Sequence, residues 1–182
     1  MTTLTYSAPS WCFQPETMTP DAYFSKLREM GISGAEMVPA AHWDEARKHD
    51  LALVNMSGPG MEEGLNRKKN HGELVPAIRK CIGDAGQQGI PYVIVFSGNR
   101  EGQEDAEGIA NCADALRKLA PVAADANVTL LFEMLNGYDH PDYQGDHTAY
   151  ALELVRAVDS PALKILYDIY HMYRMGEKIE ET

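Results

Sequence analysis

Two acidic residues end apolar runs of the chain. Glu133 ends the run TLLFE, and Asp168 ends the run KILYD. If both runs are strands of one parallel sheet, their carboxyl ends meet at one edge, and the two side chains can converge there. Mg²⁺ and Mn²⁺ favour carboxylate oxygens as ligands. The pattern therefore predicts a divalent metal site, although either acid alone could equally be a helix cap or a salt-bridge partner.

His171 follows Asp168 by three residues. If the chain turns into a helix directly after the strand, residues three apart lie on the same side of that helix. His171 could then face the same opening as the acids and serve a metal or proton-transfer site. The alternative is a structural histidine packed against Tyr170 and Met172.

Two more histidines, His140 in GYDHPDY and His147 in GDHTAY, come after the run that ends at Glu133. Both are expected to be structural and not ligands. His147 should lie near the start of a helix, with Asp146 as the cap of that helix.

Polar and aromatic residues follow two other apolar runs. Asn99 and Arg100 should project from the same face as the acids, where an arginine could bind a carboxylate or phosphate of a substrate. Arg100 could instead be an exposed loop residue. Trp11, Cys12 and Phe13 could form an apolar wall for a small ligand, or they could belong to the core.

Short β-rich runs alternate with stretches of helical apolar spacing, which predicts βα units and a parallel sheet. The predicted strands are 4–6, 35–38, 52–56, 92–96, 128–133 and 163–168, and the predicted helices are 21–30, 41–50, 71–89, 106–127 and 146–159. The count fits an open doubly wound sheet or a (β/α)8 barrel that lacks its last two units. No glycine-rich phosphate turn follows the first strand. The longest irregular segment, 57–70, is either a functional loop or a solvated excursion.

Composition narrows the class of protein. The 182 residues predict one domain, and the net charge of -11 argues against a nucleic-acid partner and against an anionic membrane surface. The amino terminus lacks the features of a secretory signal, and no apolar run is long enough to span a bilayer. The three cysteines, Cys12, Cys81 and Cys112, are far apart, which predicts reduced thiols and a cytoplasmic location. A small polar substrate fits this charge best.

Six stretches together resemble the xylose isomerase-like TIM-barrel family, and within it the hydroxypyruvate isomerase branch of sugar isomerases and epimerases. They run in order across nearly the whole chain: SWCF at 10–13, GLNRKKNH at 64–71, IVFSGNREG at 94–102, LLFEMLN at 130–136, GDHTAY at 145–150 and LYDIYHM at 166–172. LYDIYHM after a strand that contains FE is the most specific of them.

The resemblance implies a (β/α)8 barrel whose fifth and sixth strands deliver Glu133 and Asp168 to a divalent metal, Mn²⁺ or Mg²⁺. It implies that His171 contacts a substrate oxygen and that Glu133 takes part in proton transfer through an enediol. The implied substrate is a small sugar or hydroxy-keto acid, with Trp11, Asn99 and Arg100 as candidate binding residues.

Family members also have a histidine ligand on the seventh strand and a glutamate on the eighth, and this sequence stops at Thr182 before either. The expectation is therefore a single, incomplete barrel domain over 1–182, truncated after about six βα units and impaired in activity. Unpaired sheet edges favour a homo-oligomer. Two alternatives compete with the isomerase, namely a non-catalytic barrel fragment that serves binding or assembly and an endonuclease IV-type DNA repair enzyme, which the negative charge disfavours.

Overall fold

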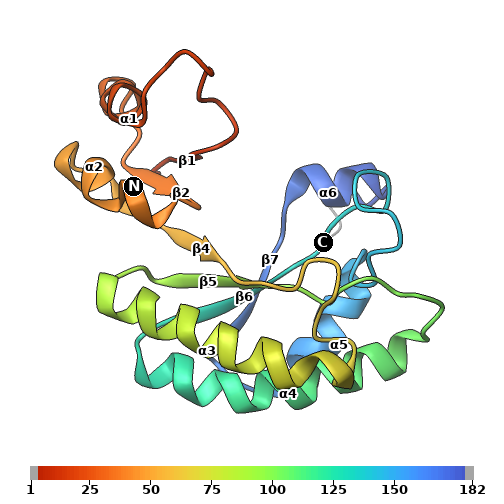
Figure 1. Cartoon of the computed structure of the whole chain (residues 1–182). Coiled ribbons are helices and arrows are strands. Elements are labelled where there is room, and N and C mark those ends of the chain that lie inside the picture. The colour runs from red at the N-terminus through yellow and green to blue at the C-terminus, as the bar shows by residue number, and fades with distance from the viewer. Residues whose placement is uncertain (1–3, 179–182) are drawn as a thin grey trace.

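Strands and helices alternate along the chain, and all pairings between the named strands are parallel. The computed structural model describes residues 4–178 (Figure 1). The strands are β1 (Ser7–Pro9), β2 (Gly34–Glu36), β3 (Ala52–Leu53), β4 (Asn55–Ser57), β5 (Tyr92–Val95), β6 (Thr129–Glu133) and β7 (Leu163–Leu166). The helices are α1 (Pro20–Glu29), α2 (Trp43–Lys48), α3 (His71–Gln88), α4 (Asp105–Asp125), α5 (Thr148–Val158) and α6 (Ile169–Arg174), with short 3₁₀ turns at Ala40–His42 and Lys68–Asn70. The predicted α/β class is confirmed.

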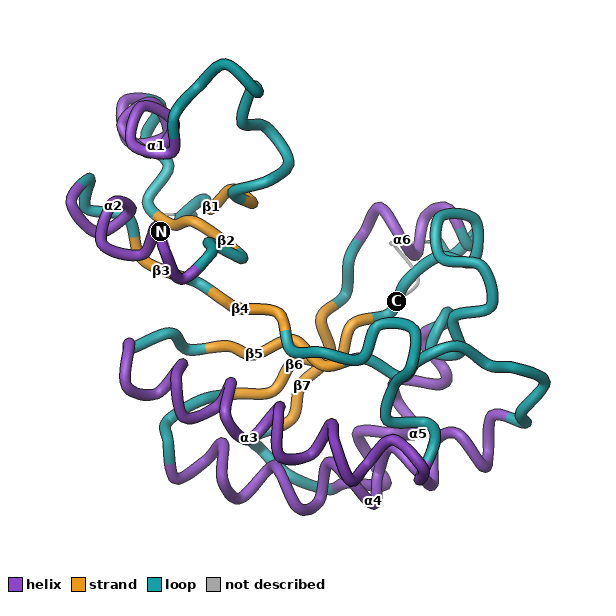
Figure 2. The backbone as a smooth tube through the Cα atoms, in the orientation of Figure 1, coloured by secondary structure: helices purple, strands orange, loops and turns teal. Residues whose placement is uncertain are grey.

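The strands form two sheets, ordered β1-β2-β3 and β4-β5-β6-β7. The single strand predicted over 52–56 is divided at Val54. The N–H group of Val54 still donates to the carbonyl of Ala35 in the first sheet, at 2.9 Å, whereas β4 pairs with β5. One extended run therefore passes from the first sheet into the second and joins them (Figure 2).

The strand predicted at 4–6 is wrong in position, because β1 starts at Ser7. β1 and β2 pair only from Ser7 onward, because the residue opposite Ser7, Gly34, is the first residue of β2. Tyr6 contributes its carbonyl, which accepts hydrogen bonds from the backbone N–H groups of Ser33 and Gly34. Leu4 and Tyr6 are exposed, so the apolar residues that suggested a strand lie at the surface.

Helices α3, α4 and α5 cover one face of the second sheet (Figure 1). α3 buries Leu74, Ile78, Ile82 and Ala85, which form one stripe at helical spacing. The three longer helices predicted from this periodicity are confirmed, with bounds shifted by a residue or two. A helical layer on the outside of a parallel sheet is the arrangement of a (β/α)8 barrel. Within residues 4–178, none of the helices is long and apolar enough to cross a membrane.

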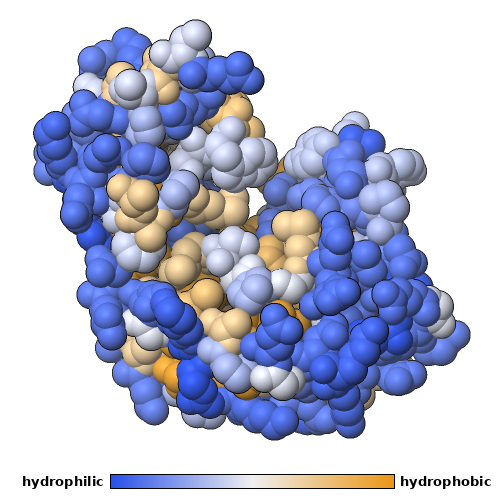
Figure 3. All heavy atoms as spheres, in the orientation of Figure 1, coloured by the Kyte–Doolittle hydropathy of each residue, from blue (hydrophilic) through white to orange (hydrophobic). Residues whose placement is uncertain are grey.

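The other face of the second sheet is open and concave. Successive strand residues point to opposite faces, and Val95 and Phe132 join the large core beneath the helices, whereas Ile94 belongs to a small separate cluster on the opposite face. Figure 3 shows a hollow at this face with apolar residues on its floor. Glu133 follows Phe132 and therefore faces the hollow.

Buried polar side chains tie together the loops at the carboxyl ends of β4, β5 and β6. The backbone N–H of Asn66 donates to the carbonyl of Ser97 at 2.8 Å, and its amide Nδ2 donates to Gln144 Oε1 at 2.8 Å. The hydroxyl of Tyr143 accepts from the N–H of Ser97 at 2.9 Å and donates to the carbonyl of Glu133 at 2.8 Å. These bonds fix the end of β6 relative to its neighbours.

Residues 64–66 of the segment 57–70 are buried against the loop after β5, so the solvated alternative is wrong for these residues. Gly64 and Gly98 touch through their backbones, and a Cβ atom on Gly64 would overlap the carbonyl group of Ser97. Gly98 also has a positive φ of 101°, which favours glycine. The close approach depends on the absence of side chains at both positions.

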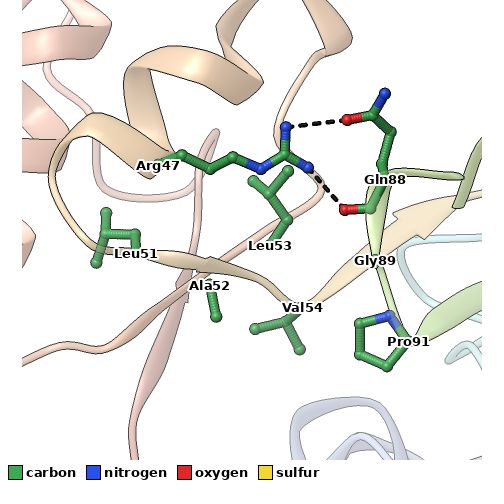
Figure 4. A pocket seen from close by; sticks show the side chains of 8 residues that line it. All are labelled: Arg47, Leu51, Ala52, Leu53, Val54, Gln88, Gly89 and Pro91. Atoms are coloured by element: carbon green, nitrogen blue, oxygen red, sulfur yellow. Dashed lines mark hydrogen bonds between the residues drawn. The ribbon is translucent and has the colours of Figure 1, made fainter.

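A pocket of about 380 Å³ lies between the two sheets at the amino end of the strands. Arg47 of α2 crosses to the end of α3, and its guanidinium donates to Gln88 Oε1 at 2.9 Å and to the Gln88 carbonyl at 2.7 Å (Figure 4). The lining residues include no acid and no histidine. We interpret the pocket as a structural joint, remote from the carboxyl-end edge.

Replacing Gly64 by alanine should destabilise the fold, because the added methyl group meets backbone that cannot move aside freely. We expect a loss of about 2–3 kcal/mol in the free energy of unfolding, measured by urea denaturation. Gly83→Ala is the matched control: Gly83 lies in α3, a Cβ atom there would meet nothing within 4 Å, and alanine should stabilise by about 1 kcal/mol. Equal effects of the two substitutions would contradict the packing described for the segment 57–70.

Candidate metal centre

Strand β6 delivers Glu133 to the edge of the concave face. Glu133 is the last residue of the strand and lies in register with Leu166 of β7. Its backbone carbonyl is held by Tyr143, so the carboxylate emerges beside the end of β7. The predicted convergence of strand-end acids depends on this pairing.

Asp168 lies just beyond β7 and is the N-cap residue of α6. Its Oδ1 accepts the N–H of Tyr170 at 2.8 Å, which satisfies one of the free donors at the start of the helix. The other oxygen, Oδ2, lies 3.9 Å from Nε2 of His171. The helix that would place His171 beside Asp168 is therefore present, and the cap occupies only one carboxylate oxygen.

Glu133, Asp168 and His171 each offer one ligand atom, and these atoms lie within 4.8 Å of one another. Ligands of one ion at bond lengths of about 2.0–2.6 Å are at most about 5 Å apart, so the three fit around a single cation. In the part of the chain that the structure describes, no other group of three such residues comes together in this way.

The carboxylate of Glu133 is in an unfavourable environment for a negative charge. Burial, and after it the charges of Asp168 and Glu36, raises the pKa of Glu133 from 4.5 to about 7. All three causes act in the same direction, and among the described residues none stabilises the ionised form. A half-buried acid without a partner is typical of functional sites.

This environment fits a divalent cation. Two carboxylates face each other across the edge of the sheet, and no lysine or arginine of residues 4–178 forms an ion pair with either of them. A cation would remove the repulsion that raises the pKa of Glu133. Glu133 Oε and Asp168 Oδ2 are the atoms that would hold it.

His171 is largely buried, and burial lowers its pKa below the ordinary value while the charge of Asp168 opposes that shift. Burial therefore favours the neutral form of the imidazole. Its Nδ1 lies 3.1 Å from the backbone N–H of Asn136 and 2.7 Å from the Asn136 side-chain amide. The rings of Tyr170 and His140 lie nearby, with centroids 5.2 and 5.5 Å away.

Asn99 and Arg100 follow β5 at the same end of the sheet but differ in their surroundings. Asn99 lines a small cavity of about 80 Å³ together with His140. The guanidinium of Arg100 pairs with Asp105 at 2.6 Å and approaches Asp146 to 4.0 Å. Arg100 is thus engaged with the starts of α4 and α5, and its role in binding substrate stays a prediction.

Trp11 lies in the loop after β1, and its side chain is 68% exposed, so it is not part of the core. Its role as an apolar wall stays a prediction.

Asp146 does not cap α5 as expected. Its Oδ1 pairs with Nδ1 of His147 at 2.7 Å, and this interaction raises the pKa of His147. The first helical N–H, that of Thr148, donates to Glu177 instead, at 2.9 Å. The carboxylate of Asp146 is drawn to the imidazole, and an acid distant in sequence satisfies the helix.

Sequence reasoning missed two residues that shape the site. Glu36 ends β2 as Glu133 ends β6, and it accepts hydrogen bonds from Ser7 at 2.5 Å and Asn55 at 3.1 Å. The same strand-end rule would have found it. Asn136 contacts His171 across 35 positions of sequence, and no local pattern reports such a contact.

The chain is similar in sequence to known proteins. Residues 24–182 match the model of the xylose isomerase-like TIM barrel. The chain is 37% identical to hydroxypyruvate isomerase of Escherichia coli (strain K12), over 88% of this chain and 67% of that protein. It is 27% identical to a probable endonuclease 4 of Chloroflexus aurantiacus, over 73% of this chain and 44% of that protein.

Solved structures share the fold at lower identity. An AP endonuclease of family 2 from Brucella melitensis superposes with a TM-score of 0.85 at 20% identity, over 98% of this chain and 74% of that one. The E. coli 3-keto-D-glucoside 4-epimerase gives a TM-score of 0.76 at 18% identity, over 98% and 73%. The zinc-bound IOLI protein gives 0.77 at 15% identity, over 97% and 67%.

Replacing Glu133 by glutamine should change how stability depends on pH in the metal-free protein. The folded state keeps a proton on Glu133 up to about pH 7, whereas the unfolded chain loses it near pH 4.5. The wild type therefore loses stability as pH rises through this window, by up to about 3 kcal/mol. The glutamine variant escapes this loss, so its advantage should be absent at pH 4.5 and complete above pH 7.

Urea denaturation in a chelating buffer at several pH values measures this difference. Glu153→Gln serves as the control, since Glu153 is exposed on α5. Parallel stability curves for the wild type and the Glu133 variant would show that the acid is not destabilised by its surroundings.

Proposed function

Because the chain belongs to the xylose isomerase-like TIM barrel family, we propose that it works as a metal-assisted isomerase or epimerase of a small sugar or hydroxy-keto acid. The observation that carries the proposal is the convergence of Glu133, Asp168 and His171 at the carboxyl edge of β6 and β7. Carboxylates and a neutral imidazole are groups that can carry out proton transfer beside a carbonyl.

The proposed cation is Mn²⁺ or Mg²⁺, held by Glu133 and Asp168. Oxygen ligands suit both ions better than they suit softer metals. The bound ion supplies Lewis acidity at the substrate carbonyl. Water or residues outside 4–178 would complete the coordination, because the described chain offers two carboxylates and one imidazole here.

Glu133 is the proposed base. The pKa of Glu133 is about 7 in the metal-free site, and a bound cation would lower it, so that the ionised carboxylate would be present at neutral pH to accept the substrate proton. In hydroxypyruvate the proton comes from the hydroxymethyl carbon, the electrons move to the carbonyl, and an enediol results. Return of the proton to the former carbonyl carbon, with transfer of the hydroxyl proton from the former hydroxymethyl oxygen to the former carbonyl oxygen, completes an isomerisation and leaves an aldehyde.

His171 is the proposed partner of the substrate oxygen. It is neutral, largely buried and adjacent to Asp168, so it can donate a hydrogen bond without adding a charge to the site. Asn99 and Arg100, after β5, and Trp11, after β1, complete the proposed binding residues on the same edge.

Hydroxypyruvate is the first substrate to test, since the relative that is 37% identical to this chain carries that name. A ketose is the second substrate to test, because two of the similar solved structures carry the names of sugar epimerases. A cytoplasmic location and a homo-oligomer stay predictions from the cysteines and from the outer edges of β1 and β7.

Binding of Mn²⁺ should depend on both acids and should release a proton. Near pH 6 most Glu133 is protonated, so calorimetry in buffers of different ionisation enthalpy should report about one proton released per ion, falling toward zero by pH 8.5. Glu133→Gln/Asp168→Asn should abolish the binding. Asp125→Asn/Glu153→Gln makes the same chemical changes on exposed helix positions and should leave it intact. Binding that survives the first double substitution would rule out this centre.

Proton exchange tests the chemistry directly. With Mg²⁺ in D₂O, the chain should exchange the hydroxymethyl protons of hydroxypyruvate with solvent, which NMR follows as loss of signal. Exchange requires only proton removal and return at one carbon, so it detects the first half of the reaction. Glu133→Gln should slow it by about 10³-fold. Exchange no faster than in buffer, despite metal binding, would favour the alternative of a non-catalytic binding module.

A further inference from the structure

We infer that Asn136 is a positioning residue that holds the single proton of the His171 ring on Nε2 and thereby makes His171 a hydrogen-bond donor instead of a metal ligand. The inference about the ring stands on the hydrogen bonds of Asn136. Only its catalytic consequence rests on the proposed isomerase function.

The orientation of the Asn136 amide is determined by its neighbours. Its Oδ1 accepts the backbone N–H groups of Tyr138 at 3.0 Å and Asp139 at 2.9 Å. Its Nδ2 lies 3.0 Å from the carboxylate of Asp139, which can only accept. A flipped amide would place NH₂ against two N–H donors and an oxygen against a carboxylate. Nδ2 is therefore the atom that faces His171.

Two donors thus point at Nδ1 of His171. The amide Nδ2 of Asn136 lies 2.7 Å away, and the backbone N–H of the same residue lies 3.1 Å away. A ring nitrogen that accepts a hydrogen bond cannot carry a proton, and neutral imidazole has one proton. That proton must be on Nε2.

The Nε2–H group is free to bind a ligand. Within residues 4–178 its nearest carboxylate oxygen, Oδ2 of Asp168, is 3.9 Å away, beyond hydrogen-bond length. A protonated Nε2 has no lone pair for a cation. The three-membered group of Glu133, Asp168 and His171 therefore divides into two carboxylates that can bind metal and one donor aimed at an oxygen atom beside it.

The loop that carries Asn136 is clamped to α6. Asp139 accepts a hydrogen bond from the Tyr170 hydroxyl at 2.6 Å and pairs with Arg174 at 3.3 Å. The guanidinium of Arg174 also lies over the ring of Tyr138, 5.1 Å from its centroid. Since His171 is on α6 as well, donor and acceptor are held on two elements that are locked together.

The tautomer can be read from ¹⁵N–¹H correlation spectra of histidine-labelled, metal-free protein at pH 8.5, where the neutral ring dominates. The His171 signals are assigned by their loss in His171→Gln. In the wild type we expect the ¹⁵N signal of Nδ1 to be that of a ring nitrogen without a proton and the signal of Nε2 to be that of a protonated ring nitrogen. Asn136→Asp offers a carboxylate that accepts from the ring, so the proton should move to Nδ1 and the two types should exchange places.

Two further variants keep the test decisive. Asn136→Ala retains only the backbone donor and should give a mixture of tautomers, which decides the matter if the aspartate variant does not fold. Asn127→Asp introduces the same charge before β6, at the opposite end of the strand from Asn136, and should leave the spectrum unchanged. A protonated Nδ1 in the wild type, or a spectrum unaffected by both Asn136 variants, would overturn the inference.

The catalytic consequence is measured separately. Asn136→Asp should reduce the exchange rate of bound hydroxypyruvate by about 10²-fold, because Nε2 loses its proton, and should tighten Mn²⁺ binding, because Nε2 gains a lone pair. Suppose that the spectra show the proton on Nε2 but the wild type does not exchange the protons of hydroxypyruvate. The role of Asn136 would then be upheld, and the proposed isomerase function would be contradicted. Exchange activity in a wild type that carries the ring proton on Nδ1 would support the isomerase function and contradict the role of Asn136.

Discussion

The alternation of side chains along β6 is the constraint on which the rest of the site depends. Leu130 and Phe132 are fully buried beneath the helices, and they cannot leave that core without a large loss of apolar burial. Glu133, one residue further, must then face the concave side. A shift of one residue in register would reverse every side chain of the strand. The packing of the helices therefore decides where the acid points.

Hydrogen bonds between the loops after β4, β5 and β6 then fix the position of Glu133 at the end of its strand. Tyr143 binds the carbonyl of Glu133 and the N–H of Ser97, and Asn66 binds the carbonyl of Ser97 from the other side. Asn66 and Ser97 have no exposed surface, so water cannot replace these bonds. The carboxyl ends of three strands move as one unit, which is what a site assembled from several loops requires.

Much of this arrangement is readable from the sequence, and the reasons for the failures are specific. The position of Glu133 at the end of a strand, the position of Asp168 just beyond a strand, and the helix that begins after Asp168 follow from local patterns. The division of one strand at Val54 does not, because it depends on which neighbour each half pairs with. The contact of Asn136 with His171 arises from two loops brought together by the sheet, and Gly64 reveals its role only when the opposite backbone is in place.

The site also carries a cost that the fold tolerates. Glu133, Asp168 and Glu36 bring three acids of one sign toward one hollow, and Met37, next to Glu36, has a positive φ of 49° that side-chain-bearing residues rarely adopt. The clustering of the acids is unfavourable, because burial and the charges of Asp168 and Glu36 disfavour the ionised form of Glu133. Local departures from the most stable choice concentrate where function requires them. A positive φ by itself does not distinguish the carboxyl edge, since Asp50, beside the Arg47 joint, has one as well. The raised pKa of Glu133 does distinguish it, because no acid lines the joint, and this difference supports the carboxyl edge as the proposed site.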